Sequence, residues 1–194
     1  IENLVADYKK NLNERNIQPL SDDYIKFIRF GQHFIEKNGE GILAYINPQG
    51  FLDNPTFRGM RWNLMQSFDK IYSIDLHGNS KKKETAPDGS IDQNVFDIMQ
   101  GVSINLFIKT GKKKKTELGK VFHYDLFGKR DLKYDFLSGN LLKDVAFQEL
   151  KPNEPNYFFI PKNDEGRNVY ENGFRVDELF TKNVTGIVTM GDEF

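Results

Sequence analysis

The segment from Ser21 to Leu76 alternates between helical and extended patterns of apolar residues, and this alternation restricts the possible folds more than any other feature. The first helical pattern is carried by Tyr24, Phe27, Ile28, Phe34 and Ile35. A continuous apolar run, 42–46, follows it directly. A second helical pattern, carried by Phe57, Met60, Leu64 and Phe68, precedes a strand pattern over 70–76. Helix, strand, helix and strand in this order predict a doubly wound α/β fold.

The boundaries of the first helix and strand are also marked in the sequence. Ser21 can cap a helix whose first turn carries Asp22 and Asp23, and Asn38-Gly39 supplies a stop signal. The run 42–46 does not alternate, which predicts a strand covered on both faces in a mostly parallel sheet.

The pattern changes after residue 76. Residues 77–94 form a long polar insert, rich in Gly, Ser and Lys. Two alternating runs follow, at 102–108 and around 120–126, and the short Gly- and Lys-rich segment between them predicts an antiparallel hairpin. Beyond residue 128 the patterns predict only a short strand in NYFFIP, 156–161, and a short helix in RVDELF, 175–180.

Composition excludes several classes of protein. The 27 basic and 28 acidic residues nearly balance, so attraction to nucleic acid must come from local patches. The absence of cysteine excludes disulfides and thiolate metal sites, and the three histidines are far apart in the sequence, so no metal site is predicted. The absence of cysteine also fits a reducing cytoplasm. No apolar run approaches the ~20 residues that span a bilayer, which predicts a soluble protein with no membrane partner.

Two candidate pairs of site residues follow predicted strands, at the strand ends where open α/β sheets bind ligands. The amide of Asn47, before Pro48, can both donate to and accept from an adenine edge, but Asn-Pro is also an ordinary turn opener. Asp75 and His77 can form an acid–base pair, and the alternative is a solvent-facing loop histidine.

Two further candidates suit nucleic acid. Lys81, Lys82 and Lys83 form a basic run that can contact DNA phosphates, or simply a solvated turn. Phe96 closes the long insert just before an alternating strand, where its ring can stack on an extruded base or merely plug the loop.

Four strings, in this order and spacing, resemble the C-terminal half of adenine-specific DNA methyltransferases fused into single-chain restriction-modification enzymes of type IIG and type ISP. The resemblance covers roughly residues 15–135. The strings are YIKFIRFGQHFIEKNGEGILAYINPQGFL, KIYSIDLHGNSKK, NVFDIMQGVSINLFIKTG and GKVFHYDLFGKR. The tail GFRVDELFTKNVTGIVTMGDEF resembles the linker into the target-recognition domain of such enzymes.

The resemblance implies a partial Rossmann-like, S-adenosylmethionine-dependent methyltransferase fold. Residues 1–135 would hold the second half of the sheet, with the antiparallel hairpin, and 136–194 an irregular segment leading toward a target-recognition domain. The glycine-rich cofactor loop and the catalytic Asn-Pro-Pro-aromatic loop would lie upstream, so no catalytic residue is expected here. The first residue, Ile1, suggests either an excised portion of a longer protein or a processed terminus.

The resemblance also assigns roles to the candidates. Phe96 in Val95-Phe96 matches the residue whose ring packs on the flipped adenine, although the loop that follows it, 97–101, departs from the family in length. Asn47 and Pro48 end the strand beside the catalytic one, and so would line the substrate cleft without performing the chemistry.

The predicted partners are double-stranded DNA with a flipped adenine, the missing N-terminal half of the same protein, and a second copy of the chain at the exposed sheet edge. The parent protein is expected to methylate adenine with S-adenosylmethionine, and this chain alone is expected to be inactive. Two alternatives remain open. One is a non-catalytic DNA-binding or specificity module, and the other is an unrelated α/β enzyme that uses Asp75 and His77.

Overall fold

The structure is a computed structural model that describes residues 2–10, 12, 14, 16–163, 166, 169–170, 172–174 and 176–180. The chain divides into two compact units, with the boundary after Pro161. The second unit contains α6, Val176–Leu179, which confirms the short helix predicted in RVDELF. None of the helices described here has the length and apolarity needed to cross a membrane. All candidate site residues lie in the first unit.

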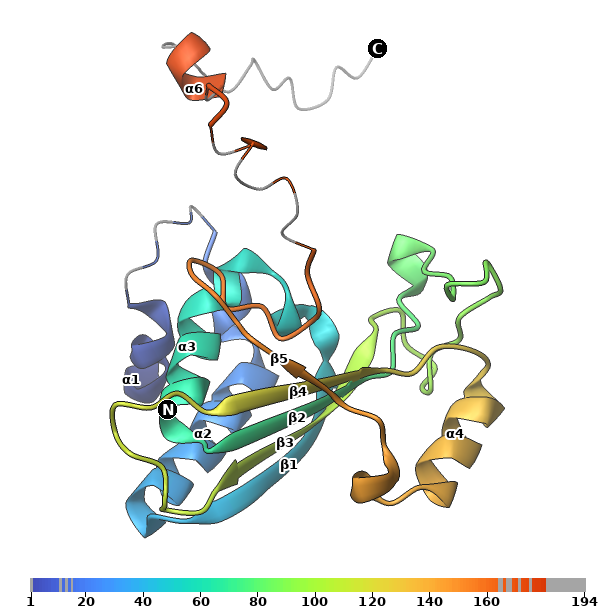
Figure 1. Ribbon diagram of the computed structural model, residues 1–194, viewed down its shortest axis with the longest axis horizontal. Coiled ribbons are helices and arrows are strands. Elements are labelled where there is room, and N and C mark those ends of the chain that lie inside the picture. The colour runs from blue at the N-terminus through green and yellow to red at the C-terminus, as the bar shows by residue number, and fades with distance from the viewer. Residues whose placement is uncertain are drawn as a thin grey trace, which may run out of the picture. The chain divides into compact units, whose positions relative to one another are not determined.

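The first unit is built on one mixed, five-stranded sheet (Figure 1). Its strands are β1 Gly41–Pro48, β2 Lys70–Asp75, β3 Val102–Lys109, β4 Lys120–Asp125 and β5 Gln148–Leu150. The spatial order is β1-β3-β2-β4-β5. β3 runs antiparallel to both of its neighbours, β2 and β4 are parallel, and β5 is antiparallel to β4. β1 and β2 therefore point the same way, and the predicted α/β fold class is confirmed.

Helices cover one face of this sheet, and a further helix packs on part of the opposite face. The helices are α1 Glu2–Val5, α2 Asp23–Asn38, α3 Arg58–Ser67 and α4 Arg130–Gly139. The first three gather on the same face (Figure 1), over a core that includes Ile28, Leu64 and Phe107. α4 packs at the opposite face, where the ring of Phe136 stacks on Tyr124 at 5.3 Å between centroids.

The predicted ends of α2 are partly confirmed. The helix stops where Gly39 adopts a left-handed conformation with φ 88°, as the Asn-Gly signal predicts. At the other end the prediction is wrong by one residue. Ser21 ends a short 3-10 helix, η2 Gln18–Ser21, and the N-cap position is taken by Asp22, whose side chain makes no capping hydrogen bond.

The predicted antiparallel hairpin is wrong, because β3 and β4 do not pair. β2 lies between them and is hydrogen-bonded to both. The connection over 110–119 is much longer than a hairpin turn and crosses the end of β2 instead. Gly119 makes the crossing possible, because its amide donates to the Met65 carbonyl and a Cβ there would overlap the Phe68 carbonyl.

The prediction that β1 is covered on both faces is also wrong for the described residues. β1 is an edge strand, hydrogen-bonded only to β3. Leu43 and Tyr45 pack against the core beneath α2, but Ile42 and Ile46 point to the other face and are 66% and 48% exposed. The run is therefore apolar on both faces of β1, although no described helix covers the face that carries Ile42 and Ile46.

The segment from residue 128 to Pro161 contains more regular structure than the sequence patterns predict. α4 and β5 were not predicted, whereas NYFFIP forms no strand. Its Phe159 is instead a core residue, and the Phe159 amide donates to the Leu52 carbonyl. The strand prediction is wrong because the apolar residues there pack as a loop over the core.

Candidate functional site

Polar side chains gather on the α2–α3 face of the sheet toward the carboxyl ends of β1, β2 and β4. The strand register aligns the residues in rows across the sheet. The innermost row is apolar and comprises Leu43, Phe107, Ile71 and Val121. The next comprises Tyr45, Asn105, Ser73 and His123, and the last comprises Asn47, Ser103, Asp75 and Asp125. The polarity of this face thus rises toward the end where open α/β sheets bind ligands.

The amide of Asn47 is buried in this polar face, with 3% of the residue exposed. Its Oδ1 accepts from Asn105 Nδ2 at 3.0 Å, and its own Nδ2 donates to the Pro48 carbonyl. Asn105 in turn accepts from Ser73 Oγ at 2.7 Å. The structure therefore places Asn47 and Pro48 at the predicted strand end. The contact of Asn47 with a base stays a prediction, and it would require an exchange of these hydrogen bonds.

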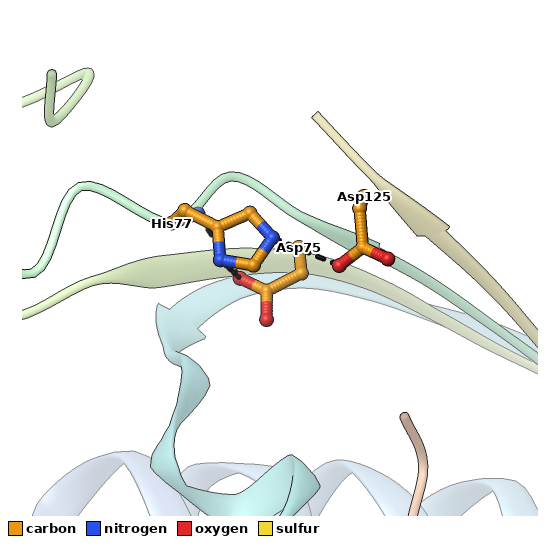
Figure 2. Close-up of side chains that lie close together, drawn as sticks. All are labelled: Asp75, His77 and Asp125. Atoms are coloured by element: carbon orange, nitrogen blue, oxygen red, sulfur yellow. Dashed lines mark hydrogen bonds and ion pairs between the residues drawn. The ribbon is translucent and has the colours of Figure 1, made fainter. Parts of the chain in front are cut away.

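His77 lies just beyond β2 among the carboxylates of Asp75, Asp125 and Glu84. Figure 2 shows the ring with Asp75 and Asp125. Its Nε2 is 2.8 Å from Asp125 Oδ1 and its Nδ1 is 2.9 Å from Glu84 Oε1. Asp75 Oδ1 accepts from the His77 backbone N–H at 3.0 Å and lies 3.9 Å from Nδ1. The ring also stacks on Phe127, with 3.8 Å between centroids. The structure thus brings Asp75 and His77 together, and adds two acids that sequence reasoning did not connect to them.

The electrostatics of this cluster favour a charged imidazole. Burial by itself would lower the pKa of His77, but its hydrogen bonds to Asp125 and Glu84 outweigh burial and raise the pKa to about 9. Burial raises the pKa of Asp75 to about 6, despite the opposing charge of His77. Burial also acts to raise the pKa of Asp125, but hydrogen bonds from His123 and His77 reverse this and bring it below the ordinary value. At neutral pH, His77 is therefore an imidazolium that holds the ends of β2 and β4 together.

Replacing His77 with Gln is expected to lower stability most at mildly acidic to neutral pH. Because the pKa of His77 is higher in the folded chain, its stabilisation is present in full below the unfolded pKa of about 6.5 and is lost as the pH rises through about 9. Each unit of pKa shift corresponds to about 1.4 kcal/mol, so the loss near pH 6 is on the order of 3 kcal/mol. Urea unfolding of both proteins between pH 6 and 10 measures it, and a constant difference across this range would contradict the assignment.

The same cluster is the place where the described residues could offer metal ligands. Ligand atoms from Asp75, His77 and Asp125 all lie within 4.8 Å of one another. Both ring nitrogens of His77 already face carboxylates, so an ion would have to replace at least one of these hydrogen bonds. The engaged ring is also a poor proton shuttle, because His77 is only 8% exposed. These contacts favour a structural role for the cluster.

Phe96 lies beside a surface pocket at this end of the sheet. The residue is 41% exposed, and its backbone N–H donates to Asn94 Oδ1. The pocket has a volume of about 660 Å³, and its lining includes Gly78, Asn94 and Arg130 as well as Phe96. This exposure leaves part of the residue accessible to a ligand. Stacking on a base stays a prediction.

The two lysine runs lie at opposite ends of the sheet. Lys81 and Lys82 belong to the 3-10 helix η5, Ser80–Lys82, and Lys83 follows it in a left-handed conformation with φ 50°. All three are exposed and follow the carboxyl end of β2, where Phe96 and Asn47 lie. The run 112–115 follows β3, which is antiparallel to β2, and so lies at the far end. The geometry therefore allows Lys81, Lys82 and Lys83, but not the second run, to contact one ligand together with Phe96.

Sequence reasoning missed the residues that come from α4 and from the end of β4. Asp125 ends an alternating strand, and the position of that strand beside β2 was not predicted. Arg130 lies in a segment without an apolar pattern, so its place next to Phe96 had no local signal. Lys133 is fully buried, which is unusual for its residue type and cannot be read from helical periodicity.

Comparisons with known proteins give structural but not sequence matches. No protein-family model matches the chain, and no curated protein matches it. The chain is similar to a structure described as the ATP-dependent Type ISP restriction-modification enzyme LlaBIII bound to DNA, with 25% identity and a TM-score of 0.71. The match covers 86% of this chain and 11% of that one.

Two further structures are similar in fold. One is a DrdV–DNA complex, with 23% identity, a TM-score of 0.70, and coverage of 84% of this chain and 16% of that one. The other is a nuclease-deletion mutant of the Type ISP restriction-modification enzyme LlaGI in complex with a DNA substrate mimic, with 19% identity, a TM-score of 0.69, and coverage of 86% and 14%. The chain thus spans between 11% and 16% of the length of these proteins.

Proposed function

We propose that this chain is the C-terminal half of the methyltransferase domain of an adenine-specific DNA methyltransferase, within a single-chain restriction-modification enzyme. The parent enzyme would transfer a methyl group from S-adenosylmethionine to the exocyclic amine of adenine. The observation that carries the proposal is the similarity of 86% of the chain to a Type ISP restriction-modification enzyme bound to DNA. The four sequence strings resemble the same class of enzyme.

The geometry of the site suits the handling of an extruded base. An enzyme that modifies a base amine must take the base out of the stack, and an aromatic side chain can then hold it. Phe96 offers an exposed ring beside a pocket, and Lys81, Lys82 and Lys83 lie at the same end of the sheet for contacts to phosphates. Asn47 and Pro48 form the neighbouring strand end. In this proposal the chain holds the base and the DNA, and the catalytic loop lies in the preceding half.

The described residues do not fit S-adenosylmethionine by themselves. In 16–163, no glycine-rich turn joins the end of a strand to a helix, as a cofactor cradle would require. The turn after β1 contains only Gly50, and a Cβ there would meet open space, so nothing approaches it closely. The proposal therefore assigns the main cofactor loop to the preceding half and derives no step from the cofactor here.

The open edge of β1 is the proposed contact with that preceding half. Ile42 and Ile46 expose apolar surface on β1, and Phe27, Phe30 and Phe34 expose more on α2. A further strand paired with β1, and a helix packed on each of these faces, would remove this surface from water. In the isolated chain the same edge is available to a second copy, so we expect the isolated chain to self-associate.

The isolated chain is expected to have no methyltransferase activity. Calorimetry should detect no binding of S-adenosylmethionine, and incubation with DNA and tritiated cofactor should transfer no label, because the cofactor and catalytic loops are missing. The full-length gene product is the positive control and should do both. Binding and turnover by the isolated chain would overturn its assignment as half of a domain.

The upstream sequence of the gene separates this proposal from a non-catalytic DNA-binding module. A glycine-rich loop and an Asn-Pro-Pro-aromatic motif before this chain support the enzyme. Their absence, together with DNA binding that does not depend on S-adenosylmethionine, would replace the enzyme by the module.

A further inference from the structure

Helix α4 holds the backbone of the segment that carries Phe96. Four consecutive carbonyl groups, those of residues 93–96, each accept a hydrogen bond from an α4 side chain. Lys133 Nζ donates to the Gln93 carbonyl at 2.7 Å, and Tyr134 Oη donates to the Val95 carbonyl at 2.7 Å. Arg130 binds the other two, with Nε 2.8 Å from the Asn94 carbonyl and one terminal nitrogen 3.1 Å from the Phe96 carbonyl.

A loop segment bound in this way has little freedom of direction. Half-buried carbonyls need partners, and one helix supplies them for Gln93, Asn94 and Val95. The same helix also binds the more exposed Phe96 carbonyl. Asn94 adds a second restraint from within the loop, because its Nδ2 donates to the Gly78 and Gln100 carbonyls while its Oδ1 accepts from the Phe96 amide. The backbone on both sides of the Phe96 Cα is therefore fixed relative to α4 and to the end of β2.

The helix is itself anchored to the sheet. Lys133 is completely buried, donates to the Leu76 carbonyl at 2.6 Å and pairs with Asp92. Phe136 stacks on Tyr124 of β4. The restraint on Phe96 therefore runs through α4 to β2 and β4, the strands whose ends carry the His77 cluster.

We propose that α4 sets the direction of the Phe96 ring toward DNA, and that Arg130 is the positioning residue that does so. The role of the ring in holding a base rests on the proposed function. The restraint on the loop rests only on the hydrogen bonds described above. Arg130 is suited to the task because its planar guanidinium binds two carbonyls and the Asp97 carboxylate at once, which an ammonium on a flexible chain cannot reproduce.

The Asp97 contact is the least important of the three. The Asp97 side chain is 92% exposed, so the pair is screened by solvent, and exposed pairs contribute little. The carbonyl bonds fix the backbone directly. The proposal therefore separates Arg130, whose loss frees the loop, from Asp97, whose loss leaves the carbonyl bonds in place.

The test uses the full-length gene product and the variants Arg130→Gln, Phe96→Ala and the double variant. Loss of a stacking ring is expected to lower kcat/KM by about 10- to 100-fold. Arg130→Gln should lower it by about tenfold, mainly through kcat, because a misdirected ring holds the base poorly after DNA has bound. Because Arg130 acts through the ring, the double variant should be no worse than Phe96→Ala.

Three further variants serve as comparisons. Arg130→Lys should recover only part of the activity, Asp97→Asn should stay within about twofold of wild type, and Lys129→Ala changes a cation beside Arg130 and should have no effect. Independently of activity, hydrogen exchange at the Phe96 amide should accelerate in Arg130→Gln and remain slow in Asp97→Asn.

The outcomes separate this inference from the proposed function. If the wild type transfers no methyl group, the function fails, and hydrogen exchange still tests the restraint. If the wild type is active but Arg130 and Phe96 act additively, or if exchange at the Phe96 amide is unchanged, the positioning role of Arg130 is wrong and the function stands.

Discussion

Replacing Asp92 with Asn is expected to destabilise the chain by about 3 to 5 kcal/mol, the range for removing one partner of a buried ion pair. Asp92 and Lys133 both have fully buried side chains, and Lys133 Nζ lies 2.9 Å from Asp92 Oδ1. Asn is nearly isosteric but neutral, so the buried ammonium loses its counter-charge and is left with neutral acceptors, among them the Leu76 and Gln93 carbonyls. The variant thus leaves a charge without compensation where water cannot reach it.

Urea unfolding followed by circular dichroism measures this effect. The double variant Asp92→Asn with Lys133→Met is the matched control, because it removes both charges and should recover much of the loss. A loss below about 1 kcal/mol for Asp92→Asn alone would place the pair among weak surface contacts and would contradict the role of Lys133 as the anchor of α4.

Replacing Gly78 with Ala is expected to lower the free energy of unfolding by more than about 3 kcal/mol, since backbone strain and a steric clash add. Gly78 has φ 77°, a conformation that costs a residue with a Cβ about 1 to 2 kcal/mol. In addition, a Cβ on Gly78 would overlap the backbone of Asn94, which cannot move freely because α4 holds its carbonyl. The substitution therefore also disturbs the Phe96 loop.

Gly89 offers a close control for this substitution. Its φ of 81° is nearly the same, but a Cβ on Gly89 would meet nothing within 4 Å. Gly89→Ala should therefore show only the conformational cost, about 1 to 2 kcal/mol. Equal losses in the two variants would show that the close approach of Gly78 to Asn94 does not restrain the loop.

The features that the sequence predicts well are those that depend on local spacing. The stop of α2 at Gly39 follows from the need for a left-handed residue, which glycine adopts without strain. The pattern of apolar residues over 70–76 predicts the position of β2. The order of helices and strands is sufficient to predict the α/β fold class. Asp75 and His77 are two residues apart at the end of that strand, so their proximity could also be inferred.

The features that the sequence does not reveal depend on long-range pairing. The pairing of β2 with both β3 and β4 is decided across the sheet, and alternating residues in two runs cannot show that a third strand lies between them. Asp125 reaches His77 across a sequence separation of 48 residues. α4 escapes prediction because it buries a cation, Lys133, while its Leu132 is 61% exposed.

Adenine methylation is tested by mass spectrometry of DNA from cells that express the full-length gene, compared with cells that express its Phe96→Ala variant. We expect N6-methyladenine at specific sites in the first DNA, and about 10- to 100-fold slower methylation by the purified variant. The absence of N6-methyladenine from DNA exposed to a folded, DNA-binding wild-type protein with S-adenosylmethionine would contradict this expectation.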